Sequence, residues 1–453
     1  MGSSEQSNDG LVQFGSALKK EFPFDPEFRN LNHGSFGAAP RAVHAKVQEY
    51  RARADAVQDI FLRYEYPRKL DDARAAVAQL VNAPLDTVVF VPNATTAVNV
   101  VLRNLVWDAD GRDEILCFSV IYGACGKTVD YAVDSARGLV SSRSVDLAYP
   151  LEDDDIVQAF RDAVATSRAE GKRPRLAIYD VVVSQPGVRF PFEELTRACR
   201  ELGVLSLIDG AQGIGMLPLD LAALDPDFFV SNCHKWLHVP RACALFHVPV
   251  RNQHLLTSTL PTSHGYRSQG AARANPLPQD GAKPAFVSNF EFVGTLDNAA
   301  YLAVKDALEW RENVLGGERR IIEYLWTLAK EGGSKVADIL GTQVLDNKKG
   351  TLTNNAMVNI FLPIKTSPDA VAPSSGSDGY VVLPSQDAAQ AVTWMLSKLM
   401  DEYKTFIPIC CHAGKWYVRL SAQVYLDTED FAWAGRVLKE LCERVGKHEY
   451  KDV

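Results

Sequence analysis

Several features that would assign this sequence to a class at once are missing from it. It contains no run of about 18 apolar residues, so we expect no membrane-spanning helix. Positive charge is not in excess: 48 Lys and Arg stand against 56 Asp and Glu, a formal net charge of −8. Nucleic acid is therefore not an expected partner. The first predicted strand is followed by PNATTA instead of the GxGxxG fingerprint, which excludes a Rossmann oxidoreductase.

Cysteines are few and unpatterned. The eight are scattered over 453 residues, with Cys410 and Cys411 adjacent and no spaced CxxC pairs. Neither a disulfide framework nor a structural zinc site is predicted, and we expect no metal. The first residues, MGSSEQSNDG, lack both the cationic start and the apolar stretch of a secretory signal. We therefore expect a cytoplasmic protein.

Short apolar segments, which alternate with helical patterns, predict the fold. Segments with the composition of strands are 87–91, 114–120, 175–183, 204–209, 228–233 and 243–248. Helical stretches between them, such as FEELTRACREL, indicate βαβ units and a mostly parallel sheet, hence an α/β protein. After Thr295, predicted strands and helices become sparser along the sequence. We predict an N-terminal tail and arm (1–37), a large α/β domain (38–295) and a smaller C-terminal α+β domain (296–453).

Polar residues follow three of the predicted strands, where open α/β sheets bind ligands. Asp209 ends VLSLID, Lys235 follows the next strand in SNCHKW, and NATTA opens a helix. Pyridoxal 5′-phosphate (PLP) requires such a set: a carboxylate at its pyridine nitrogen, a lysine for its aldehyde and a helix N-terminus for its phosphate. Each residue alone could be a helix cap or a solvated charge. The three in this order favour a PLP site.

NATTA, DGAQ and HKWL, in this order, resemble the class V aminotransferase family of fold-type I PLP enzymes, from about Asn32 to Gln423. LNHGSFG and YVRLSAQ add a resemblance to the isopenicillin N epimerase-like branch. The resemblance implies cofactor contacts for Asp209 (pyridine nitrogen), Gln212 (3′-oxygen), Lys235 (aldehyde), Tyr122 (ring face), Thr95, Thr96 and His234 (phosphate), and Thr295 (phosphate of a partner subunit). It thus also implies a homodimer. Asn232 departs from the serine that family members often have there, which puts that phosphate contact in doubt.

Substrate contacts follow from the same resemblance. Arg419 would hold the α-carboxylate of an amino-acid substrate with its bidentate fork. Asn32 and His33 would contact the substrate, although His33 could equally be a packing residue.

The resemblance implies a reaction on a sulfur-bearing amino acid, carried by IYGACGKTVDYA, SNCHKWLHVPRACA and FVGTLDNAAY. We expect a PLP-dependent carbon–sulfur lyase that removes a sulfenic acid from a cysteine-conjugate sulfoxide by β-elimination and leaves pyruvate and ammonia. Hercynylcysteine sulfoxide, an ergothioneine precursor, is the expected substrate. Lys235 would remove the Cα proton, and Tyr122 would either donate a proton to the leaving group or only stack on the ring.

Other reactions of the family remain open. A cysteine desulfurase needs a thiol on a mobile loop, whereas Cys410 and Cys411 lie in a predicted strand and tight turn close to Arg419. Epimerase and aminotransferase share the same machinery. A non-enzymatic protein of this fold is disfavoured because Lys235 and Asp209 are both present.

Overall fold

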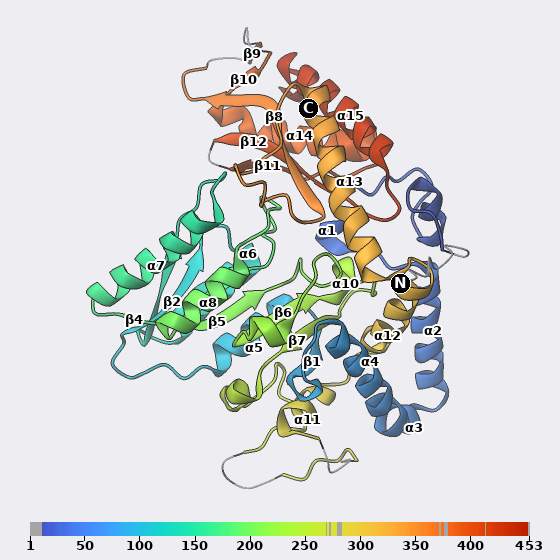
Figure 1. Cartoon of the computed structure of the whole chain (residues 1–453), viewed down its shortest axis with the longest axis vertical. Helices are drawn as coiled ribbons and strands as arrows, with labels where there is room; N and C mark the ends of the chain where they lie inside the picture. The colour runs from blue at the N-terminus through green and yellow to red at the C-terminus, as the bar shows by residue number, and fades with distance from the viewer. Residues whose placement is uncertain are drawn as a thin grey trace, which may run out of the picture.

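The computed structural model describes residues 11–268, 270, 273–278, 283–370, 373–375, 379–412 and 414–451; the first ten residues of the predicted tail lie outside them. It has two lobes, each built on one β-sheet (Figure 1). Among the described residues, no helix is both long and apolar enough to span a membrane.

The larger sheet has seven strands. They are β1 (Val88–Val91), β2 (Asp113–Phe118), β3 (Val140–Val145), β4 (Arg173–Asp180), β5 (Leu205–Asp209), β6 (Phe228–Asn232) and β7 (Ala244–His247), in the order β1-β7-β6-β5-β4-β2-β3. Only β7 pairs antiparallel, with β1 and β6, so the prediction of a mostly parallel sheet is confirmed. Strand β3 was not predicted: its sequence, VSSRSV, is polar because it lies at the sheet edge.

Helices connect these strands. They are α5 (Ala94–Asn104), α6 (Gly123–Ser135), α7 (Asp153–Ala169), α8 (Phe192–Leu202), α9 (Leu221–Leu224) and α10 (Cys233–Trp236). Four of them, α5 to α8, correspond to helical stretches predicted from the sequence. Helix α8 illustrates the local rules. Two glutamates occupy its first turn, where they complement the helix dipole, and Gly203 ends it in the left-handed conformation.

The chain before the large sheet and the chain after it pack together. The first part contains η1 (Ser16–Glu21), α1 (His33–Phe36), α2 (Arg41–Ala56), α3 (Gln58–Ile60), η2 (Phe61–Glu65), α4 (Tyr66–Leu80) and η3 (Leu85–Thr87). The second contains η4 (Val250–Leu255), α11 (Ala285–Glu291) and α12 (Ala299–Asn313). Helix α12 lies against α2 and α4 (Figure 1).

The smaller lobe has a five-stranded sheet of order β11-β12-β8-β10-β9. Its elements are α13 (Gly317–Leu340), β8 (Met357–Ser367), β9 (Ser374–Ser375), β10 (Val381–Pro384), η5 (Ser385–Asp387), α14 (Ala388–Asp401), β11 (Ile409–His412), β12 (Lys415–Ser421), α15 (Thr428–Gly446) and η6 (Glu449–Lys451). Helix α13 packs against α15 and β8.

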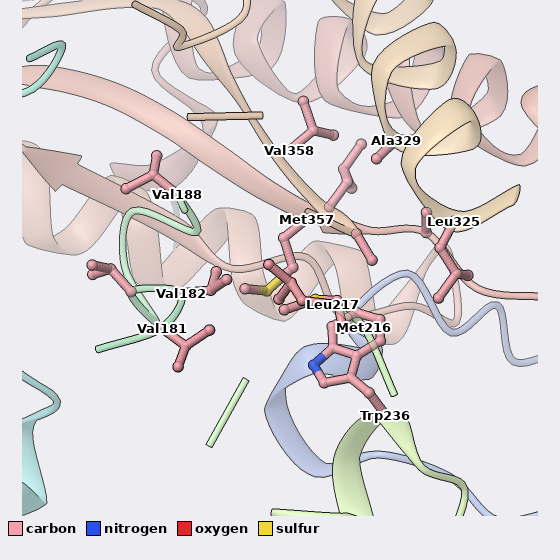
Figure 2. Packing of buried hydrophobic residues seen from close by; sticks show 14 of the residues in the cluster. Val181, Val182, Val188, Met216, Leu217, Trp236, Leu325, Ala329, Met357 and Val358 are labelled. Carbon is pink, nitrogen blue, oxygen red and sulfur yellow. The ribbon is translucent and has the colours of Figure 1, made fainter. Parts of the chain in front are cut away.

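One hydrophobic core continues across both lobes. Figure 2 shows Trp236 and Met216 of the large lobe packed near Met357 of β8 and Leu325 of α13. The N-terminal segment 29–37, which we call the strap, joins the lobes as well: Arg29 forms a β-bridge with Thr405 of the small lobe. The predicted domain boundaries at 37/38 and 295/296 stay predictions.

Candidate active site

Lys235 lies in the short helix α10, directly after the buried strand β6. Burial lowers the pKa of its amine to about 8; the charge of Arg419 acts in the same direction, whereas Asp209 and Asp180 partly oppose it. Lys235 therefore shares a site with these three groups. A lysine with such a pKa is partly neutral near physiological pH, as a nucleophile or base must be.

Two carboxylates end neighbouring strands beside this lysine. Asp209 is buried at the end of β5, where one oxygen accepts a hydrogen bond from the amide of Ala211 (2.9 Å) and the other from the thiol of Cys125 (3.2 Å). Asp180 ends β4 directly opposite Asp209. Burial and the charge of Asp209 raise the pKa of Asp180 well above its usual range, which favours the protonated form of Asp180. Sequence reasoning missed Asp180, although RLAIYD offered the same strand-end signal.

The N-terminus of α5 is already partly capped. Asn93 Oδ1 accepts hydrogen bonds from the amide and the hydroxyl of Thr96 (2.9 and 3.0 Å), and Asn232 Oδ1 accepts one from the amide of Ala94 (3.0 Å). Asn232 therefore fixes the helix N-terminus against the end of β6. An anion at this end would contact the amide and hydroxyl of Thr95, and the hydroxyl of Thr96 would have to turn from Asn93 to donate to it.

His234, the third predicted phosphate contact, has one ring nitrogen engaged and one left over. Its Nδ1 is bonded to the carbonyl of Cys243 at 2.8 Å, which leaves Nε2 for a ligand. Burial lowers its pKa to about 4, with the charges of Lys235 and Arg241 acting in the same direction, so the ring is neutral. Gly37 (φ +66°) packs on this helix so closely that an added Cβ would lie 1.8 Å from the carbonyl oxygen of His234.

His33 and Gln212 hold α10 in place. The ring nitrogens of His33 bond to the carbonyl of Lys235 (Nε2, 2.7 Å) and the hydroxyl of Tyr425 (Nδ1, 2.9 Å). Gln212 donates to the carbonyl of Gly34 and accepts from the indole of Trp236, both at 2.7 Å. His33 thus has the contacts of a packing residue, the second of its two predicted roles. The 3′-oxygen contact predicted for Gln212 could use only its remaining N–H.

Arg419 is a buried cation with no acidic partner among the described residues. It lies on β12, 1% exposed, and Nη1 donates to the carbonyl of Ser184 (2.5 Å). Nη2 donates to Asn32 Oδ1 (2.7 Å) and Ser35 Oγ (2.9 Å), and Nε has no partner. Asn32 thus orients the arginine from the strap. A guanidinium held by neutral groups only is poised for an anionic ligand. Sequence reasoning missed Ser35 and Ser184, which nothing but the fold brings to Arg419.

Tyr122 and Thr295 both lie at the surface. Tyr122, 48% exposed, immediately precedes α6, whose Cys125 contacts Asp209, so its backbone lies within one helical turn of a residue that contacts the site. Thr295 is exposed in the segment before α12, and its neighbour Leu296 is 52% exposed. Such exposed apolar surface suits a contact with a second subunit.

Cys410 and Cys411 form part of strand β11, which pairs antiparallel with β12. Cys410 is half-buried and Cys411 exposed, as alternation along a strand requires. Both are held in a ladder, so neither belongs to a swinging loop.

PLP fits this set of side chains. Asp209, a buried carboxyl group at a strand end, suits a protonated pyridine nitrogen; Lys235 suits the aldehyde; and Thr95, Thr96 and His234 suit the phosphate. The uncompensated charge of Arg419 remains for the substrate. When bound, PLP supplies a sink for electrons released at the substrate Cα.

Comparison with known proteins agrees with this geometry. The sequence model of the family described as aminotransferase class-V matches residues 36–362. The chain belongs to the aminotransferase class-V family. This family member is 38% identical over 453 residues to the L-cysteine desulfhydrase-like protein lolT1 of Epichloe uncinata, an alignment that covers 97% of the chain and 98% of the relative. It is 30% identical over 431 residues to the hercynylcysteine sulfoxide lyase of Schizosaccharomyces pombe (95% and 98% covered).

The fold of this class-V family member is that of solved relatives. The cystine C-S lyase C-DES, solved with its product cysteine persulfide, superimposes with a TM-score of 0.71 at 18% identity and covers 94% of the chain and 98% of its own. The predictions of family, of a fold-type I PLP enzyme and of a PLP-dependent carbon–sulfur lyase are confirmed. The roles given to individual residues stay predictions.

Proposed function

We propose that the chain cleaves the Cβ–S bond of a cysteine-conjugate sulfoxide, with hercynylcysteine sulfoxide as its substrate in ergothioneine biosynthesis. The observation that carries the proposal is the buried, unpaired guanidinium of Arg419 beside Lys235, because it suits the α-carboxylate of an amino acid whose Cα lies near that lysine. The relative from S. pombe supports the choice of substrate.

Each of three side chains has its own role in the proposed reaction. Arg419 binds the carboxylate and orients Cα, and Lys235, whose lowered pKa makes its amine available, accepts the Cα proton. The C–S bond breaks, sulfur leaves with the bonding electrons, and Tyr122 donates a proton to the departing sulfenate. Water hydrolyses the remaining three-carbon fragment, so one conjugate and one water yield a sulfenic acid, pyruvate and ammonia.

L-cysteine desulfhydrase is the second candidate, because the relatives from Epichloe uncinata carry that name. Cysteine desulfurase is disfavoured because Cys410 and Cys411 are fixed in strand β11. We also propose a cytoplasmic homodimer in which Thr295 completes the partner's phosphate site.

Pyruvate release by the PLP-loaded protein distinguishes these activities. We expect release from hercynylcysteine sulfoxide at a kcat/KM well above that from L-cysteine. A higher kcat/KM with L-cysteine would replace the proposal by a desulfhydrase, and alanine formed instead of pyruvate would indicate a desulfurase. Lys235→Ala should abolish turnover.

The acid role of Tyr122 has a matched control in α6, the helix that Tyr122 precedes. Tyr122→Phe should retain the visible absorbance of the bound cofactor but lower kcat by about a hundredfold, the lower range for a lost general acid. Tyr131, also 48% exposed, stacks on Arg103 instead, so Tyr131→Phe should leave kcat unchanged. A normal kcat for Tyr122→Phe would reduce Tyr122 to a stacking residue.

A further inference from the structure

A cavity of about 480 Å³ opens beside the strap; we call it the strap pocket, and it shares His234 with the proposed phosphate site. The lining side chains with aromatic or cationic character are Phe24, Phe36, His44, Arg51, His234 and Arg241. Cavities of this size hold ligands as large as a drug molecule. No step of the proposed reaction uses this space.

The strap pocket adjoins the active site at helix α10 and at Gly37 of the strap. His234 lines the pocket and directly precedes Lys235; Gly37 also lines it, and an added Cβ there would lie 2.8 Å from the Cα of Lys235. The residue before Phe36 is Ser35, which accepts a hydrogen bond from Arg419. The strap thus runs from Arg419, which Ser35 contacts, to the pocket, which Phe36 lines, so the pocket is the neighbouring space for a substituent of a substrate held at Arg419 and Lys235.

The pocket is positively charged. Among the described residues, no Asp or Glu lines it. Burial lowers the pKa of His44, and the charges of Arg241 and Arg51 lower it further; Arg241 acts on His234 in the same way. Burial thus pushes both imidazoles toward the neutral form, and the charge of Arg241 adds to this effect on each.

Of the two arginines, Arg241 is the one whose charge is not neutralised by an ion pair with a described residue. Arg51 is paired with Asp297 (Nε to Oδ2, 2.6 Å), so part of its charge is neutralised. Arg241 is exposed and makes no ion pair with any residue that the structure describes. An incoming anion would therefore meet Arg241 as the unpaired cation of the pocket.

We propose that the strap pocket binds the sulfur substituent of the substrate and selects substituents that carry a carboxylate, with Arg241 as the recognising cation and Phe36 as an apolar wall. Phe36 is 71% exposed, which suits a side chain that packs on a ligand rather than on the core. The inference rests on the proposed function and specifies its substrate class. The hercynine part of hercynylcysteine sulfoxide, which bears a carboxylate, belongs to that class.

The test compares two substrates that differ only in charge: S-(2-carboxyethyl)-L-cysteine sulfoxide and its S-(2-carbamoylethyl) amide. We expect the holoenzyme to prefer the acid in kcat/KM. Arg241→Gln should lower the acid-to-amide ratio about fivefold, the effect of a charge pair at a partly exposed site. Arg319→Gln, an exposed arginine on α13 outside the pocket, is the control and should leave the ratio unchanged.

Three results would overturn the inference. The first is an unchanged ratio in Arg241→Gln. The second is a weaker affinity for PLP in a cofactor titration, which would assign Arg241 to the phosphate. The third is a loss of the dimer on gel filtration, which would assign Arg241 to a subunit contact. If neither sulfoxide is cleaved, the proposed function fails separately. The acid-to-amide ratio of binding affinities, read from the absorbance of the bound cofactor, then still tests the pocket.

Discussion

Replacing Arg419 by methionine should abolish substrate binding and yet leave the fold at least as stable. The guanidinium is 1% exposed, and burial lowers its pKa to about 10. An ordinary arginine has a pKa of about 12.5, and each tenfold change in proton affinity is worth about 1.4 kcal/mol, so the charge costs the native state about 3 kcal/mol. Since the group is protonated in both states at neutral pH, this cost is fully present there and declines only above a pH of about 10.

Lost hydrogen bonds offset part of the gain. The carbonyl of Ser184 would lose its donor, whereas Asn32 Oδ1 would keep the one from Ser35 (2.9 Å). A buried unsatisfied acceptor costs about 1–3 kcal/mol. The free energy of unfolding of Arg419→Met should therefore lie between that of the wild type and about 2 kcal/mol above it.

Arg311 is the matched control, because it is also 1% exposed but is paired with both carboxylate oxygens of Glu318. Arg311→Met leaves that carboxylate without its partner and should lower the free energy of unfolding by about 3–5 kcal/mol. Urea unfolding of the apo proteins measures both variants. If Arg419→Met were less stable than the wild type by more than about 1 kcal/mol, Arg419 would be a structural residue. The argument that its guanidinium binds the substrate carboxylate would then fail.

Two further predictions concern the lysine and the glycine packed on its helix. The rate at which the apoenzyme takes up PLP should rise with pH through about 8 and then level off, because only the neutral amine of Lys235 attacks an aldehyde. Stopped-flow absorbance measures this rate. A rate that still rises at pH 10 would contradict the lowered pKa of Lys235. Gly37→Ala should prevent cofactor binding by displacing α10, whereas Gly138→Ala, also at positive φ (+90°) but with no atom within 4 Å of the new Cβ, should cost only about 1–2 kcal/mol. Equal PLP affinities of the two variants would refute the packing argument.

The large lobe could be predicted well from the sequence because its central strands are apolar on both faces. FEELTRACREL became α8 with the predicted ends, since Glu193 and Gly203 mark them chemically. Strand β3 escaped prediction because an edge strand alternates polar and apolar residues too weakly to stand out. The sparse apolar pattern of the small lobe likewise gave no strand order.

The candidate site was predictable where a residue ends a strand, and less so where contacts join distant segments. Asp209 and Lys235 could be named from position alone, and Asp180 satisfied the same rule unnoticed. Ser35 and Ser184 meet at Arg419 from segments that no local pattern connects. The same limit applied to His33, whose two ring contacts are 202 and 392 residues away.

The strap determines when the active site can fold during synthesis of the chain. Its residues leave the ribosome long before Tyr425 and Arg419, which bond to His33 and Ser35. Contacts at such separation form late, because the loop between them must be closed first. A nascent chain can therefore complete the large sheet and still lack a finished site. The enzyme should acquire substrate affinity only after the segment with Arg419 and Tyr425 has left the ribosome.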